Sequence, residues 1–211
     1  MSIAIIDYGS GNLRSAEKAF ARVSAALDHP RDVRVTAQPE DILKADHIVL
    51  PGVGAFGDCA QGVRAIDGMQ DALNERVRQQ AMPFLGICVG MQLMCETGLE
   101  RGAHDGFGWI GGTVEALDVP ADLKVPHMGW NQLSIEIAHP VFAGLQDRHA
   151  YFVHGFAARP ADPASVAATT QYGGEVVVGL SDETACGTQF HPEKSQHTGL
   201  QLIDNFLKWK P

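Results

Sequence analysis

Short apolar runs alternate with amphipathic stretches through the first half of the chain. Residues 3–7 form an apolar run that predicts a buried strand, and residues 12–27 follow with apolar positions at helical spacing. The same patterns predict strands at residues 33–36, 47–50 and 83–87, and helices at 71–80 and 89–95. Strands that alternate with helices are typical of a parallel sheet with helices on both faces.

The second half of the chain has shorter apolar runs, separated by Gly and Pro. They predict strands at residues 113–117, 130–135, 151–153, 166–170, 175–180 and 185–190, and an amphipathic helix at 200–207. Gly173-Gly174 between two of these strands predicts a hairpin turn. The expected fold class is therefore α/β: an open, mainly parallel sheet with helices on both faces and a mixed or antiparallel β extension. With no linker or repeat, residues 1–211 are expected to form a single domain.

The charge and composition of the chain disfavour several kinds of binding partner and cellular location. The formal net charge is −9, and an acidic surface repels phosphate groups, so nucleic acid and anionic membrane are poor partners. The first residues lack the basic region of a signal peptide, and no apolar run is long enough to span a bilayer. The four cysteines form no CxxC pair, which indicates reduced thiols and a cytoplasmic location.

A cysteine between a predicted strand and a predicted helix is the strongest chemical signal. It lies in Gly86-Ile87-Cys88-Val89-Gly90-Met91-Gln92, with a glycine two residues away on each side. This pattern is typical of a nucleophile elbow, whose tight turn needs glycines where a Cβ would clash. The elbow places the sulfur at the carboxyl edge of the sheet, and the helix N-terminus favours the thiolate. The N–H of Val89 then faces the reacting carbonyl as an oxyanion donor.

A thiolate nucleophile needs a base, and the base needs a group that orients it. Of the nine histidines, His191 stands out because Pro192 follows it and favours an extended backbone. Residues two apart in an extended segment face the same side, so Glu193 can orient the imidazole of His191. The alternatives are a surface-loop histidine and a metal site. No other His, Cys or Asp cluster has ligand spacing, so we expect no metal and no cofactor.

The remaining cysteines and histidines have simpler interpretations. A buried structural thiol is the alternative for Cys88 and the expectation for the other three, Cys59, Cys95 and Cys186. His127 and His154 border apolar segments and are candidates for hydrogen-bonded core groups. The other histidines are expected at strand ends, in loops or on the surface.

A glycine-rich loop follows the third predicted strand. Pro51-Gly52-Val53-Gly54 lies at the same edge of the sheet as the elbow, where its backbone N–H groups could bind an anion or a developing oxyanion. It lacks the Lys-Ser/Thr of a P-loop, and no GxGxxG motif is present, which disfavours nucleotide binding. A plain turn is the alternative for this segment taken alone.

The elbow segment together with Phe190-His191-Pro192-Glu193 resembles the class I, or triad, glutamine amidotransferases. Further segments are similar to one branch of that family, the glutaminase subunits of imidazole glycerol phosphate synthase in histidine biosynthesis. They cover the chain from end to end and are Ile5-Ile6-Asp7-Tyr8-Gly9-Ser10-Gly11-Asn12-Leu13, Leu50-Pro51-Gly52-Val53-Gly54-Ala55-Phe56, Pro126-His127-Met128-Gly129-Trp130-Asn131, Tyr151-Phe152-Val153-His154 and Gly187-Thr188-Gln189-Phe190-His191-Pro192-Glu193-Lys194-Ser195.

The resemblance implies a role for each matched position. Cys88 would attack the carboxamide of L-glutamine and form a glutamyl thioester, with His191 and Glu193 completing the triad. The Gly52–Val53 peptide would be the second oxyanion donor, which must reorient before it serves. The positions that would hold glutamine are Gln92 and Glu100, and those that would meet the partner are Trp130, Asn131, Tyr151 and Lys194.

The partner implied by the resemblance is a (β/α)8 cyclase subunit, in a heterodimer. It would use the ammonia to make imidazole glycerol phosphate and an aminoimidazole carboxamide ribotide. The sequence departs from the usual pattern in two places: Val89 stands where leucine is commoner, and Gly155-Phe156 lacks the hydroxyl groups usual after Val153-His154.

Other functions remain open from the sequence alone. Within the family, the chain could serve another synthase, such as that for pyridoxal phosphate or anthranilate, although Met128-Gly129-Trp130-Asn131 argues against both by resemblance. From other classes, it could be a cysteine hydrolase of peptides or other amides, or an inactive interaction module. The presence of Cys88, His191 and Glu193 together argues against the inactive module.

Overall fold

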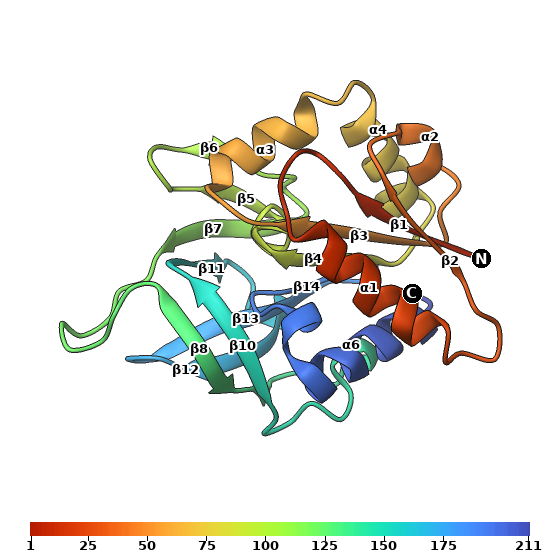
Figure 1. Ribbon diagram of the computed structural model, residues 1–211. Helices are drawn as coiled ribbons and strands as arrows, with labels where there is room; N and C mark the ends of the chain where they lie inside the picture. The colour runs from red at the N-terminus through yellow and green to blue at the C-terminus, as the bar shows by residue number, and fades with distance from the viewer.

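An eight-stranded sheet runs through the centre of the molecule (Figure 1), in the order β2-β1-β3-β4-β14-β13-β12-β9. The computed structural model describes all 211 residues. The first five strands of that order pair in parallel: β2 (Asp32–Thr36), β1 (Ser2–Ile6), β3 (His47–Gly52), β4 (Phe84–Cys88) and β14 (Ala185–Thr188). The last three continue it in antiparallel fashion: β13 (Glu175–Ser181), β12 (Val166–Gln171) and β9 (Ser134–Ile135). The predicted α/β class, with its antiparallel extension, is confirmed.

Helices cover both faces of the parallel part. Helices α1 (Leu13–Ser24) and α6 (Gln196–Lys208) pack together on one face, where Phe20 meets Phe206 edge to face. The other side carries α2 (Pro39–Ile42), α3 (Phe56–Arg64) and α4 (Met69–Leu73). One hydrophobic core joins the faces to the sheet, because apolar side chains of the strands and helices form a single cluster.

Two smaller sheets flank the antiparallel end. One has two antiparallel strands, β8 (His127–Gln132) and β10 (His149–His154), and is called the ribbon below. The other has the order β11-β7-β5-β6 and consists of β11 (Phe156–Pro160), β7 (Ile110–Ala116), β5 (Cys95–Gly98) and β6 (His104–Asp105). Short 3-10 turns lie at Pro140–Phe142, Pro163–Ser165 and Pro192–Lys194. No helix is both long and apolar enough to cross a bilayer.

The structure corrects three sequence predictions. The helix after Cys88, α5 (Val89–Gln92), is a single turn and does not reach Cys95, which begins β5. The carbonyls of Leu93 and Met94 accept N–H groups of the segment leading into β7, so they are not available to continue a helix. The helix predicted at 71–80 is α4 followed by a π-helical turn at Asn74–Gln79. The strand predicted at 130–135 is two strands, β8 and β9, in different sheets.

Candidate active site

Cys88 sits on a strained turn between β4 and α5. Its backbone angles are φ 56° and ψ −111°, a region that residues with a Cβ rarely occupy. A Cβ on Gly86 would overlap the Gly90 carbonyl oxygen, and one on Gly90 would overlap that of Leu50. Both glycines are thus required by close backbone approach, which confirms the elbow predicted from their spacing.

The helix that follows the elbow is too short to act as predicted on the sulfur. Because α5 has only four residues, its aligned peptide dipoles add to little, and the expected stabilisation of the thiolate by a helix N-terminus is correspondingly weak. The nearby imidazole of His191 is the stronger candidate for that role. The N–H of Val89, the first residue of α5, still lies beside the sulfur as part of the elbow.

His191 and Glu193 form a buried pair on the turn that follows β14. Nδ1 of His191 lies 2.8 Å from Oε1 of Glu193, and the two side chains are only 2% and 3% exposed. The backbone of His191 is extended (φ −95°, ψ 100°), as expected before Pro192. Its N–H donates to the Tyr151 carbonyl, and its own carbonyl accepts the Ser195 hydroxyl. Backbone contacts on both sides therefore fix the ring.

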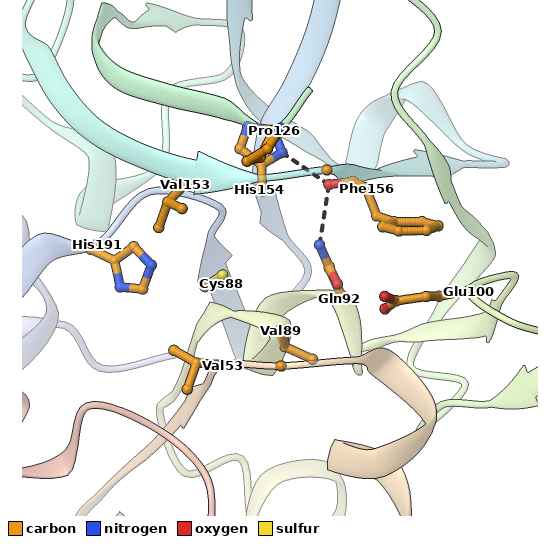
Figure 2. Close-up of a pocket in the computed structure, with 12 residues that line it drawn as sticks. Val53, Cys88, Val89, Gln92, Glu100, Pro126, Val153, His154, Phe156 and His191 are labelled. Carbon is orange, nitrogen blue, oxygen red and sulfur yellow. Dashed lines mark hydrogen bonds between the residues drawn. The ribbon is translucent and has the colours of Figure 1, made fainter. Parts of the chain in front are cut away.

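The electrostatics of this pair favour a charged imidazole. Burial acts against the charge, but the interactions with the Cys88 thiol and then the Glu193 carboxylate outweigh it and raise the pKa of His191 to about 9. Nε2 of His191 is buried and makes no hydrogen bond, so it is free to exchange a proton with a group in the pocket. The imidazole points toward Cys88 (Figure 2).

Cys88 and His191 line one pocket of about 350 Å³. Figure 2 shows His191 on one side of Cys88, with Gln92 and Glu100 on the other. Val53 and Val89 also line it. A carboxylate oxygen of Glu100 accepts the N–H of Phe56, which begins α3, at 2.9 Å. Six of the predicted site residues therefore line one cavity, whereas Glu193 and Gly52 are not part of its lining.

Sequence reasoning missed Gln189, which joins two of these residues. Its Nε2 donates to the Cys88 sulfur at 3.6 Å, and its Oε1 accepts Nε2 of Gln92 at 2.9 Å. The same Gln92 nitrogen donates to the Phe156 carbonyl at 3.2 Å. Gln189 is completely buried two residues before His191. An amide at that depth needs polar partners, and its place beside His191 is the signal that could have revealed it.

Hydrogen bonds to the backbone and close packing hold the glycine-rich loop in place. The carbonyl of Val53 accepts the Ser10 hydroxyl and, at 3.4 Å, the Cys59 thiol. A Cβ on Gly52 would lie 2.7 Å from the Gly90 nitrogen, so the loop packs directly against the elbow. Gly54 has φ +108° and room around it. The loop is therefore crowded at Gly52 and has room only at Gly54.

A family model described as glutamine amidotransferase class-I matches residues 4–209. The chain belongs to the class-I glutamine amidotransferase family. Proteins named imidazole glycerol phosphate synthase subunit HisH are 54% identical to it in Rhodospirillum rubrum and 53% identical in Rhodopseudomonas palustris, over 100% of both chains. The resemblance carried by the motifs is thereby confirmed.

Solved structures share the fold of this amidotransferase at low sequence identity. A glutamine amidotransferase superposes with a TM-score of 0.73 and 18% identity, over 99% of this chain and 98% of that one. A glutamine amidotransferase from Thermotoga maritima gives a TM-score of 0.60 and 16% identity, over 98% of this chain and 82% of that one.

The residues expected at a partner surface divide between the two faces of the ribbon. Trp130 and Tyr151 pair across β8 and β10 and meet edge to face, and the Lys194 ammonium lies 6.0 Å from the Tyr151 ring centre. Trp130 is 48% exposed and neighbouring Met128 is 62% exposed. Asn131 lies on the opposite face, where its amide donates to the Gln171 carbonyl and to His127.

Apart from His154, which also lines the pocket, the other thiols and histidines of this amidotransferase lie outside it. Cys59, Cys95 and Cys186 are buried and unpaired, and burial raises the pKa of each thiol. His127 and His154 are buried and hydrogen-bonded, as expected for core groups. His47 begins a strand, as expected, but it is also buried. No group of three or more His, Cys, Asp or Glu side chains is placed to hold a metal ion.

Proposed function

We propose that this chain is the glutaminase subunit of an imidazole glycerol phosphate synthase. It hydrolyses L-glutamine to glutamate and ammonia and passes the ammonia to a (β/α)8 cyclase subunit, which makes imidazole glycerol phosphate and aminoimidazole carboxamide ribotide. One observation carries the proposal: Cys88 lines a pocket together with His191, which is paired with the buried Glu193, in a chain that matches HisH subunits over its whole length. The single core supports one catalytic domain over residues 1–211.

The chemistry proposed at this pocket is nucleophilic substitution at the glutamine carboxamide. The Cys88 sulfur attacks the carbonyl carbon, and the imidazolium of His191 gives its Nε2 proton to the departing nitrogen, so that ammonia leaves and a glutamyl thioester remains. His191 then takes a proton from water, which attacks the thioester and releases glutamate and the thiol. Glu193 holds Nδ1 of His191 and stabilises its charge through both steps.

The negative oxygen formed in each attack needs donors. The N–H groups of Val89 and Val53 are the proposed pair, because both residues line the pocket beside Cys88. Gly54, which follows this peptide and has room around it, leaves the loop able to turn so that the Val53 N–H faces the oxyanion. The two donors therefore differ: one belongs to the elbow itself and one to a separate segment.

Charge and hydrogen bonding support the proposed substrate contacts. Both hydrogens of the Gln92 amide are used, by Phe156 and Gln189, so its Oε1 is left to accept a hydrogen bond from the substrate. The Glu100 carboxylate provides negative charge that suits the α-ammonium group of glutamine. Phe156 contributes its backbone carbonyl to this arrangement, so the missing hydroxyl groups at 155–156 are not needed for it.

The exposed side of the ribbon is the proposed docking face for the cyclase. This face combines two aromatic rings, Trp130 and Tyr151, with the cation of Lys194. Trp and Tyr are enriched at protein interfaces, where the usual cation is arginine rather than lysine. Asn131 contributes from the inner side of β8. Four unpaired thiols support a reducing compartment, and we place the complex in the cytoplasm.

The test is glutamate release from L-glutamine, measured with and without purified cyclase and its nucleotide substrate. We expect hydrolysis that depends on Cys88 and increases with the cyclase, together with a single label on Cys88 from a glutamine-like diazo-ketone. Cys88→Ala should abolish hydrolysis while the complex still makes product from added ammonia. A peptidase would ignore the cyclase, and labelling of Cys59, Cys95 or Cys186 with loss of activity would overturn the assignment of the nucleophile.

A further inference from the structure

The face of the ribbon on which Asn131 lies, opposite Trp130 and Tyr151, is called the inner face. It carries two buried histidines directly opposite each other. His127 on β8 pairs in register with His154 on β10, and the two side chains are nearly inaccessible, with 3% and 5% of each residue exposed. His127 is stacked between the rings of Phe152 and Tyr172, with ring centres 4.7 and 4.0 Å away. Neither histidine has a role in the chemistry proposed above.

These histidines lie in a directed series of hydrogen bonds. The Asn131 amide donates to Nε2 of His127 at 3.3 Å, Nδ1 of His127 lies 3.0 Å from Nε2 of His154, and Nδ1 of His154 lies 2.9 Å from the Phe156 carbonyl. The ends fix the direction, because an amide nitrogen only donates and a carbonyl only accepts. Both rings are therefore neutral and carry their proton on Nδ1. Burial lowers the pKa of both histidines, that of His154 to about 4, which agrees with neutral rings.

The series continues from Phe156 into the glutamine pocket. Its carbonyl also accepts Nε2 of Gln92, as Figure 2 shows, and Gln92 is bonded to Gln189, which reaches the Cys88 sulfur. The orientation of the Gln92 amide depends on this arrangement. Without the Phe156 acceptor, the amide could rotate and present its NH2 group to the substrate instead of Oε1.

We propose that the His127–His154 pair is a positioning device that couples the ribbon to the glutamine pocket. A protein docked on the outer face of the ribbon shifts β8 against β10, and the pair passes that shift to the Phe156 carbonyl and hence to Gln92. The inference rests on the proposed function for the identity of the partner and the substrate. Its physical basis is that both histidines belong to the same two strands as Trp130 and Tyr151, on the other side of the pleat.

Replacements at His154 can separate the two bonds of that ring. Asn places an amide nitrogen near the position of Nδ1 and keeps the bond to Phe156, but it loses the link to His127. Gln places its amide near Nε2 and keeps the link to His127, but it loses the bond to Phe156. His127→Phe keeps the stacking on Phe152 and Tyr172 and removes both hydrogen bonds. His47→Gln is the matched control, because His47 is equally buried (4%) but lies at the start of β3.

The measured quantities are KM and kcat for glutamine hydrolysis, with and without the cyclase. We expect His154→Gln to raise KM about three- to tenfold in both conditions, the scale of one lost hydrogen bond, with little change in kcat. His127→Phe and His154→Asn should keep KM within about twofold without cyclase but reduce the stimulation of kcat/KM by the cyclase about three- to tenfold. His47→Gln should behave as wild type. Stimulation that is identical in all four variants and wild type would overturn the proposal.

A measurement on the wild-type chain covers the case in which a variant fails to fold. Nitrogen-15 labelling of histidine should show two neutral rings protonated at Nδ1 near pH 7, and their signals should shift when cyclase is added. Signals that stay unchanged on saturation with cyclase would refute the coupling. Absence of any Cys88-dependent glutamine hydrolysis would instead refute the proposed function, while the tautomers of the free chain would still report whether the pair exists.

Discussion

The parallel and antiparallel parts of this molecule hold the site in different ways. In the parallel part, backbone packed against backbone fixes Cys88: a single added Cβ on Gly86 or Gly90 would overlap a carbonyl. In the antiparallel part, the two-stranded ribbon and its neighbour β11 are connected to the pocket by individual side-chain hydrogen bonds. The nucleophile thus sits where close backbone packing leaves no room for movement, whereas the Phe156 carbonyl that orients Gln92 belongs to a part where small shifts are possible.

The largest effect is expected from removing the base. His191→Ala removes the imidazole that stabilises the Cys88 thiolate and protonates the leaving nitrogen. The kcat for glutamine hydrolysis should therefore fall at least about a thousandfold. Ammonia-driven synthesis by the complex should be retained, because the cyclase does not use the imidazole. Loss of both activities would show that His191 maintains structure rather than chemistry.

Next in size is the effect of the cyclase on the glycine-rich loop. Cyclase with its nucleotide ligand should raise the glutaminase rate at saturating glutamine at least about a hundredfold, the scale of one restored oxyanion donor. Val53→Pro removes that N–H and should blunt the rise without preventing complex formation, as followed by gel filtration. Equal rates with and without cyclase would contradict this gating and leave the roles of Cys88 and His191 untouched.

A smaller loss, with a diagnostic pH dependence, is expected for Glu193→Gln. The carboxylate contributes to the raised pKa of His191, so its replacement should lower that pKa from about 9. The imidazolium is lost as pH rises through this value, and the alkaline limb of the pH–rate profile should therefore move to lower pH. An unchanged alkaline limb would show that Cys88 alone sets the charge of the ring.

Gln189 tests whether an amide on the parallel side also positions groups. Gln189→Leu keeps the volume but removes the bonds to Gln92 and Cys88, and kcat/KM should fall roughly tenfold. Gln189→Glu cannot donate to sulfur but can still accept from Gln92, so it should recover KM more than kcat. A fall in melting temperature without a change in kinetics would assign Gln189 to packing alone.

The smallest effect on activity is expected from His47, whose influence is on stability. Burial and then the Arg31 guanidinium lower the pKa of His47 to about 4, below the value of about 6.5 in the unfolded chain. Between these values the unfolded chain binds a proton that the folded chain does not, so stability falls as pH falls from 6.5 to 4. The free energy of unfolding should fall between pH 7 and 4.5 in the wild type, and this fall should be smaller in His47→Gln by on the order of 2 kcal/mol. Chemical denaturation at the two pH values measures it.

The sequence was most informative where one residue type is demanded by local geometry. The glycines around Cys88 and the proline after His191 dictate the backbone, so the elbow and the His191–Glu193 pair were predictable. The end of α5 was not, because it depends on hydrogen bonds from the distant segment that leads into β7. The division of residues 130–135 between two sheets likewise depends on β12, which follows much later in the chain.

Side-chain partners from distant segments were the least predictable part of the site. In the sequence, Gln189 is only a polar residue next to the His191 motif. The pairing of β14 with β4 brings it to Cys88. His127 and His154 were recognised as core groups, yet their connection to Gln92 depends on the turn at Phe156. Asn131 follows Trp130 directly, and only the pleat of β8 separates their directions.

The position of β14 has a consequence for how the chain folds. This strand fills the gap between β4 and the antiparallel strands, and it leads directly into the turn that carries His191. Its parallel pairing with β4 joins residues about a hundred positions apart, a contact that forms slowly because a long loop must close first. Until it forms, β4 has a bare edge open to aggregation, and Cys88 has no base. A chain in that intermediate would be prone to aggregation and would have no glutaminase activity. The pairing of β14 with β4 both covers the edge of β4 and brings the base to the thiol.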